Sequence, residues 1–105
     1  MHYIFEVHIK PGYTPERYAA AWVEASEIIQ QSRGARGTRL HRKIGSPDVL
    51  LAIATWESKA QRDAMEGAPA EAVRKIIESQ AAFVDVHLIG EYEEPEWVVL
   101  PPGMT

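Results

Sequence analysis

The sequence predicts an α+β domain whose elements follow the order β-α-β-β-α-β, and three observations support this prediction. Four segments have the alternating or continuous apolar character of strands. Two segments between them carry apolar residues at three- and four-residue spacing, and glycine and proline separate the segments. This order is the split βαβ arrangement, in which both crossover helices cover one face of a four-stranded sheet.

The composition is that of one globular domain. The chain has 105 residues, of which 46% are apolar and 25% charged. Its net charge of −4 disfavours nucleic acid as a partner, because phosphate binding needs a basic face. The chain has no cysteine, which excludes disulfides and thiolate sites and favours a reducing, cytoplasmic location. We expect no signal peptide and no membrane partner, because no apolar stretch approaches about 18 residues.

The first strand and helix have the clearest patterns. Residues 3–9 alternate, and one side of this strand is wholly apolar: Tyr3, Phe5, Val7 and Ile9. Thr14 and Pro15 predict a helix start, because threonine caps well and proline suits the first helical position. The helix should end near Ser32, and it carries one apolar stripe: Tyr18, Ala21, Trp22, Ala25, Ile28 and Ile29.

The second half repeats the alternation of strand and helix. Residues 37–44 and 49–56 are predicted strands joined by a turn at residues 45–48. The strand ending at Trp56 is apolar on both faces, which predicts a central position with cover on both sides. Ser58 should cap a helix over residues 59–66, and a second helical piece should begin at Pro69. Residues 83–91 alternate as a fourth strand.

The second apolar face of the 49–56 strand needs a cover that the predicted helices cannot supply. The simplest cover is another copy of the chain packed sheet to sheet, which predicts a homodimer. We divide the chain into a domain of residues 1–94 and a tail of residues 95–105. The apolar run 97–100 lies in an otherwise acidic, proline-rich tail. We expect it to pack on the partner subunit as an added edge strand.

Three aromatic residues are candidates for a binding cavity between helices and sheet. Trp56, at the end of its strand, could stack on a flat aromatic substrate and donate a hydrogen bond, or it could simply plug the core. Tyr18 and Trp22 lie on the apolar stripe of the first helix. Packing already explains their spacing, and they would form the walls of any pocket there.

The second strand carries a candidate base and a candidate anion contact. His41 could act as a general base on a phenol, since histidine titrates near neutral pH. The alternative is an ordinary exposed or interface histidine. Arg39 belongs to a small basic patch with Arg42 and Lys43, and one of these could hold a carboxylate or an enolate. Most such patches are solvated faces.

Two histidines and two carboxylates share the polar side of the first and fourth strands. In a split βαβ sheet these strands are antiparallel neighbours, so the four residues could cluster: Glu6, His8, Asp85 and His87. Such a group could be a metal site or a satisfied polar dimer interface.

The central stretch also resembles a known family. The run GARGTRLHR, a turn, and then VLLAIATWESKAQRDAMEGAP are similar to the antibiotic biosynthesis monooxygenase family of the dimeric α+β barrel superfamily. The matching features are a glycine before the second strand, Trp56-Glu57-Ser58 at the third strand's end, and the Gly67-x-Pro69 break. The resemblance covers residues 2–92 and implies a ferredoxin-like sandwich that forms a dimeric α+β barrel.

The resemblance implies a cofactor-free monooxygenase that acts with O₂ on an electron-rich phenol, anthrone or quinol. For such an enzyme we assign catalytic roles to Trp56 and His41 and substrate binding to Tyr18, Trp22 and Arg39, and we expect neither metal nor cofactor. The haem-degrading branch needs an asparagine on the first strand and a histidine after the strand-end tryptophan. This chain has no asparagine and no histidine between Trp56 and Val86, so we reject that activity. The alternatives are a non-catalytic binding protein for a hydrophobic small molecule or haem, and a proton-transfer isomerase.

Overall fold

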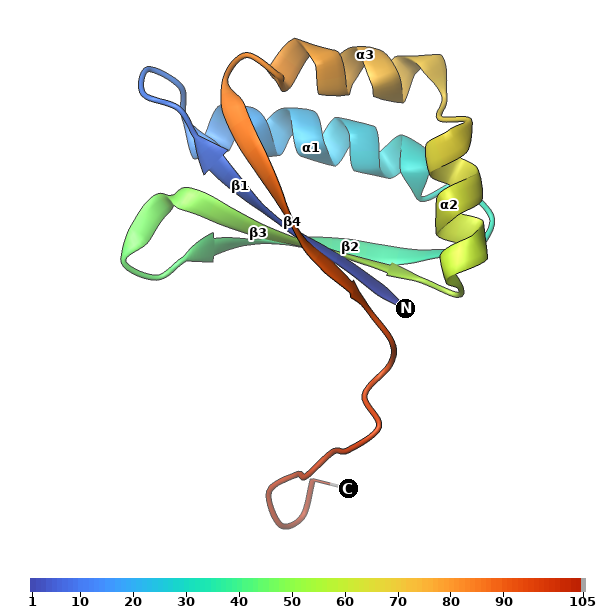
Figure 1. Ribbon diagram of the computed structural model, residues 1–105. Coiled ribbons are helices and arrows are strands. Elements are labelled where there is room, and N and C mark those ends of the chain that lie inside the picture. The colour runs from blue at the N-terminus through green and yellow to red at the C-terminus, as the bar shows by residue number, and fades with distance from the viewer. Residues whose placement is uncertain (105) are drawn as a thin grey trace.

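The computed structural model describes residues 1–104 and confirms an α+β domain with one antiparallel sheet and helices on one face (Figure 1). The elements are β1 (His2–Ile9), α1 (Pro15–Ile29), β2 (Ala35–Lys43), β3 (Ser46–Trp56), α2 (Lys59–Gly67), α3 (Glu71–Gln80) and β4 (Val84–Tyr92). The strand order is β2-β3-β1-β4. Each βα crossover therefore skips one strand, as the split βαβ arrangement requires.

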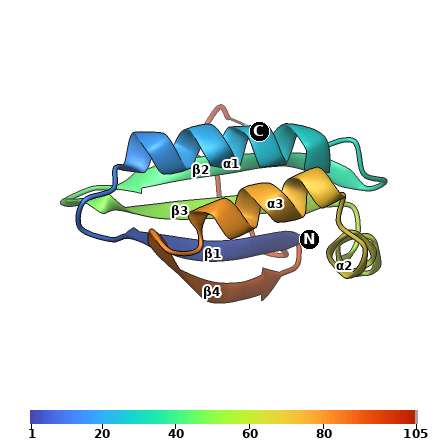
Figure 2. The ribbon, with the colours of Figure 1, turned by 90° about the horizontal axis from the view of Figure 1, so that it is seen from above.

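The helices form a layer above the sheet. Figure 2 shows α1 and α3 side by side over the strands, with α2 beyond one end of the sheet. The Thr14 side chain caps α1 by accepting a hydrogen bond from the Arg17 backbone N–H at 3.2 Å. Ser58 caps α2 in the same way, through the Gln61 backbone N–H at 3.2 Å. No helix among residues 1–104 is both long enough and apolar enough to cross a membrane.

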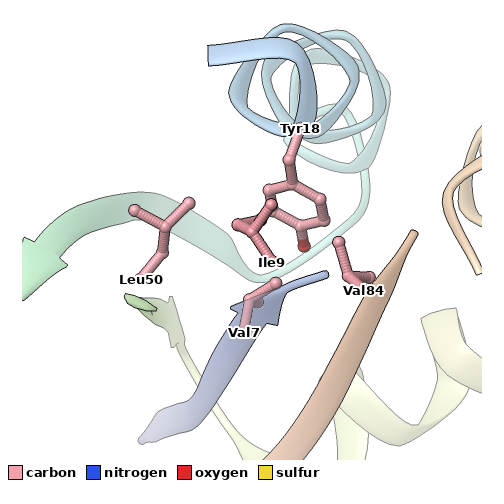
Figure 3. Close-up of a cluster of buried hydrophobic side chains, with 5 residues drawn as sticks. All are labelled: Val7, Ile9, Tyr18, Leu50 and Val84. Atoms are coloured by element: carbon pink, nitrogen blue, oxygen red, sulfur yellow. The ribbon is translucent and has the colours of Figure 1, made fainter. Parts of the chain in front are cut away.

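The core confirms the predicted faces of β1 and α1. Figure 3 shows side chains from four elements converging under the first helix: Val7, Ile9, Tyr18, Leu50 and Val84. Val7 is fully buried, and Phe5 and Trp22 pack against this cluster. The apolar side of β1 therefore faces the helices. The opposite side of β1 lies on the face of the sheet that no helix within residues 1–104 covers, which we call the open face (Figure 1).

The predicted β2–β3 turn at residues 45–48 is wrong. The turn is only Ile44 and Gly45, with Lys43 opposite Ser46, and β3 starts at Ser46. One glycine at φ 84° is enough to close this tight turn. Pro47 is tolerated inside the strand because pairing with β1 begins only at Val49.

The tail leaves the domain on the side opposite the helices and forms no strand within residues 93–104 (Figure 1). Trp97 and Val99 are 87% and 97% exposed. The predicted docking of this segment on a second subunit stays a prediction. β4 ends at Tyr92, and the division of the chain at residue 94 likewise stays a prediction.

Candidate functional site

A cavity of about 390 Å³ lies between the helix layer and the sheet. Every helix and every strand contributes to its walls. Its surface is mainly apolar, with aromatic and aliphatic side chains: Tyr3, Phe5, Trp22, Ile29, Trp56, Met65, Ile76 and Val86. A ligand cavity of a few hundred Å³ with mostly apolar walls and a few polar groups is typical of small-molecule sites.

The sequence pattern explains how α1 and β1 build the walls. The apolar stripe of α1 faces the sheet, so Tyr18, Trp22 and Ala25 point into the space below the helix. Tyr3 and Phe5 share the face of Val7, and their rings lie 5.8 Å apart between centroids. The structure therefore brings Tyr18 and Trp22 into one cavity with Trp56, where all three were expected as walls.

Trp56 is 2% exposed at the end of β3. Its backbone N–H donates to the Met1 carbonyl oxygen at 2.9 Å, and its own carbonyl accepts from the Met1 amino group at 2.9 Å. These two bonds fix the end of β3 against the start of the chain. The indole N–H of Trp56 has no hydrogen-bond partner within residues 1–104. No side-chain polar atom in these residues is both fully buried and without a partner, so the indole N–H must be accessible. Trp56 lines the cavity, which is therefore the space open to this donor.

Tyr18 is a second donor toward the cavity. Its side chain reaches from α1 down to the sheet beside Ile9 and Val84 (Figure 3). Burial raises the pKa of Tyr18 from 10.0 to about 12, because the phenolate would lose its hydration. The hydroxyl therefore stays protonated at neutral pH. It can donate a hydrogen bond to a ligand, and it cannot serve as a base.

Arg62 is the third donor, and sequence reasoning missed it. It lies on α2, is 8% exposed, and lines the cavity with Met65 from the next turn. Its guanidinium carbon lies 3.7 Å from the centre of the Tyr3 ring. The available signal was the spacing of Arg62 and Met65 on one face of a short amphipathic helix. An arginine at such a position is ordinarily solvated, so the pattern alone did not reveal its burial.

His41 and Arg39 do not line the cavity. Thr38 faces the cavity and Leu40 packs against the core, so the alternate residues Arg39 and His41 lie on the open face. Both are exposed. The structure therefore does not bring them together with Trp56 in the single chain, and a role for either residue stays a prediction.

The expected cluster on β1 and β4 forms on the open face. His8 pairs across the strands with Asp85, and Glu6 pairs with His87. His8 Nε2 lies 2.5 Å from Glu6 Oε1, and the His8 and His87 rings meet edge to face at 4.8 Å. Within residues 1–104, no group of three or more such side chains has a metal-binding arrangement. That these residues form a polar dimer interface stays a prediction.

Comparisons with known proteins agree with this architecture. The family model for the antibiotic biosynthesis monooxygenase domain matches residues 1–76. No curated relative matches the chain in sequence. A conserved protein of unknown function from Bacteroides thetaiotaomicron superposes with a TM-score of 0.70 at 14% identity, over 83% of this chain and 89% of that one.

Two further solved structures have the same fold. SnoaB, a cofactor-independent oxygenase from Streptomyces nogalater, gives a TM-score of 0.69 at 9% identity, over 91% of this chain and 96% of SnoaB. A candidate antibiotic biosynthesis monooxygenase from Deinococcus radiodurans gives 0.69 at 11% identity, over 96% and 99% of the two chains. At such identities the structural likeness shows the fold alone.

Proposed function

The chain belongs to the antibiotic biosynthesis monooxygenase family, and from this premise we propose that it oxidises an electron-rich aromatic compound with O₂ and without a cofactor. Membership of the family gives a monooxygenase-like function at the coarse level. The substrate class is the proposal: a phenol, anthrone or quinol. The main support for this substrate class is the cavity under the helices, where aromatic and aliphatic walls surround a few hydrogen-bond donors.

The walls suit a flat ring. Trp22, Trp56 and Phe5 supply large, rigid apolar surfaces that bind aromatic compounds at low entropic cost. The donors on Trp56 and Tyr18 could orient a ring oxygen. Binding the substrate in such a space also keeps bulk water away from reactive intermediates.

The chemistry needs only an ionisable, electron-rich substrate and O₂. The substrate gives up a proton to water or to a group of the partner subunit. Its anion then passes one electron to O₂, and the two radicals combine into a peroxide. When the reacting carbon is a ring methylene, it becomes a carbonyl, and the second oxygen atom leaves as water with the two hydrogens. The protein's share of the catalysis is positioning, desolvation and hydrogen bonding.

A homodimer is part of the proposal. The open face carries half-buried apolar residues at its centre, Ile4, Leu51 and Ile53, and no segment of residues 1–104 packs over them. A symmetric partner that packed its own open face there would bury them. The tail extends on the same side as this face (Figure 1) and could add apolar contacts to the partner. His41, Arg39, His8 and His87 would then be interface residues.

A second candidate function follows from what the cavity lacks. No His, Asp, Glu or Lys side chain lines it among the residues that the structure describes. A proton-transfer isomerase needs a positioned base, so the cavity argues against that alternative. A protein that only binds a hydrophobic small molecule needs none, and this observation favours it as the runner-up.

Oxygen uptake tests the proposal. Metal-stripped protein is mixed with phenols, anthrones and quinols in the presence of a chelator, and uptake should require both protein and substrate. Trp56→Phe keeps the packing and removes the indole donor, so it should lower turnover in a folded protein. His41→Ala tests the open-face histidine: lost turnover would assign it a role, and unchanged turnover would remove it. Saturable binding with no uptake across the panel would favour the binding protein.

A further inference from the structure

The ion pairs of Arg62 leave part of its guanidinium free. Within residues 1–104, its one hydrogen bond to a carboxylate is donated by Nη1 to Glu66 Oε2 at 2.5 Å. Nη1 is also the nitrogen nearest to Glu91 Oε1 and to Asp63 Oδ1, at 3.6 Å from each. The Nη2 and Nε atoms have no hydrogen-bond partner within residues 1–104. No side-chain polar atom in these residues is both fully buried and without a partner, so Nη2 and Nε must be accessible. Arg62 itself lines the cavity.

The position of this guanidinium is fixed from several sides. Its flat face lies against the Tyr3 ring, with 3.7 Å between the guanidinium carbon and the ring centre. Glu66 holds it from the following turn of α2. Glu91 lies on β4 directly opposite Tyr3 and reaches the same group. Such a group is preorganised, so little entropy is lost when a ligand binds to it.

The charge around Arg62 is already compensated. Lys59 Nζ lies 2.9 Å from Glu91 Oε2 and 3.0 Å from Asp63 Oδ2. The cations Lys59 and Arg62 and the carboxylates of Asp63, Glu66 and Glu91 therefore form one connected group of ion pairs. The group as a whole carries a charge of −1. An anionic ligand would meet this excess negative charge, and it would also lose its hydration in an apolar cavity. A neutral oxygen acceptor meets neither penalty.

We propose that Arg62 determines the specificity of this cavity by donating hydrogen bonds from Nη2 and Nε to a neutral oxygen on a flat aromatic ligand, such as an aryl ketone or a protonated phenol. The inference rests on the proposed function only in taking this cavity as the ligand site. The same arrangement selects against aryl carboxylates of similar shape. Arg62 is then the group that holds a ring oxygen at the α2 end of the cavity.

Equilibrium binding of three related tricyclic ligands tests this inference without any turnover. Fluorene and fluorenone have nearly the same shape and differ by one neutral oxygen, and a fluorene carboxylate adds a negative charge. Calorimetry or tryptophan quenching should show fluorenone binding about tenfold or more tightly than fluorene, the factor expected for hydrogen bonds from a charged donor. The carboxylate should bind more weakly than fluorenone.

Two variants assign the preference to one residue. Arg62→Met should reduce fluorenone binding to the level of fluorene while fluorene still binds, which shows that the cavity is intact. Lys59→Met is the matched control, because it removes a cation from the same ion-pair group without touching the cavity wall. It should keep the preference for fluorenone.

The outcomes separate this inference from the proposed function. Equal binding of fluorene and fluorenone by the natural protein would overturn the role of Arg62 even if Arg62→Met failed to fold. Tightest binding by the carboxylate would overturn the preference for a neutral oxygen. Oxygen uptake with other substrates could stand in both cases. If none of the three ligands bound, the inference would be overturned, because the cavity would not accept a flat aromatic ketone, while oxygen uptake with the phenols, anthrones and quinols would still decide the proposed function.

Discussion

Alkaline pH should destabilise this protein through Tyr18, a phenol that folding buries under α1. Burial raises the pKa of Tyr18 from 10.0 to about 12 in the folded protein. The unfolded chain therefore releases this proton first as the pH rises. The stability linked to Tyr18 is fully present below about pH 10 and is lost progressively as the pH approaches about 12.

The size of the effect follows from the two pKa values. A shift of about two pH units, at about 1.4 kcal/mol for each unit, gives a loss of roughly 3 kcal/mol in the free energy of unfolding. Tyr18 is 8% exposed, so solvent screens its phenolate poorly and this magnitude applies as an upper estimate. For a domain whose total stability is about 5 to 15 kcal/mol, such a loss is easily measured.

Urea unfolding at a series of pH values provides the assay. Tyr18→Phe removes the ionisable group and keeps the ring, so its free energy of unfolding should fall less between about pH 10 and 12 than that of the natural protein. Tyr92→Phe removes a phenol that is 52% exposed and serves as the matched control. It should follow the natural protein. Identical alkaline losses in the natural protein and Tyr18→Phe would refute the reasoning.

Three further predictions concern stability and assembly. Gly34→Ala should lower the free energy of unfolding by about 2 kcal/mol or more, because Gly34 has φ 87° and an added Cβ would clash with the Gln61 side chain. Gly12→Ala, at φ 88° in open space, should lower it by only about 1 kcal/mol. Urea unfolding midpoints measure the difference between the two variants. Thr14→Ala removes the cap of α1 and should lower the free energy of unfolding by about 1 kcal/mol. Thr14→Ser keeps a capping hydroxyl and should change it little in the same urea titration. Deleting residues 95–105 should weaken dimerisation in sedimentation experiments and leave the circular dichroism of the domain unchanged; undiminished association would contradict a role for the tail.

The strands and helices with strong periodicity were predictable because local pattern and tertiary packing agree there. The alternation of β1 placed Phe5 and Val7 on the helix-facing side, and the structure confirms it. The stripe of α1 placed Tyr18 and Trp22 toward the sheet. The β2–β3 turn was misjudged because a Gly-Ser-Pro-Asp run has turn chemistry throughout. The chain closes the turn with Ile44 and Gly45 and continues as strand from Ser46.

The candidate site was harder to predict because it depends on long-range contacts. The burial of Arg62 comes from Tyr3 and Glu91, which are far away in sequence, and an isolated α2 would give no reason to bury an arginine. In β2, Thr38 faces the cavity, whereas Arg39 and His41 lie on the open face. Neither side of that strand is strongly apolar, so the pattern could not place the cavity on the side of Thr38.

The structure divides its polar chemistry between the two faces of one sheet. The imidazoles of His8, His41 and His87 lie on the open face, whereas the cavity on the helix side offers donors on Tyr18, Trp56 and Arg62 and no carboxylate or imidazole among its described walls. A ligand in this cavity can therefore be held and oriented by hydrogen bonds, but no side chain lining it would accept a proton at neutral pH. A substrate that reacts there must be acidic enough to transfer its proton to water or to a group of the partner subunit. This requirement selects electron-rich aromatics that are acidic enough to lose a proton without a base in the cavity.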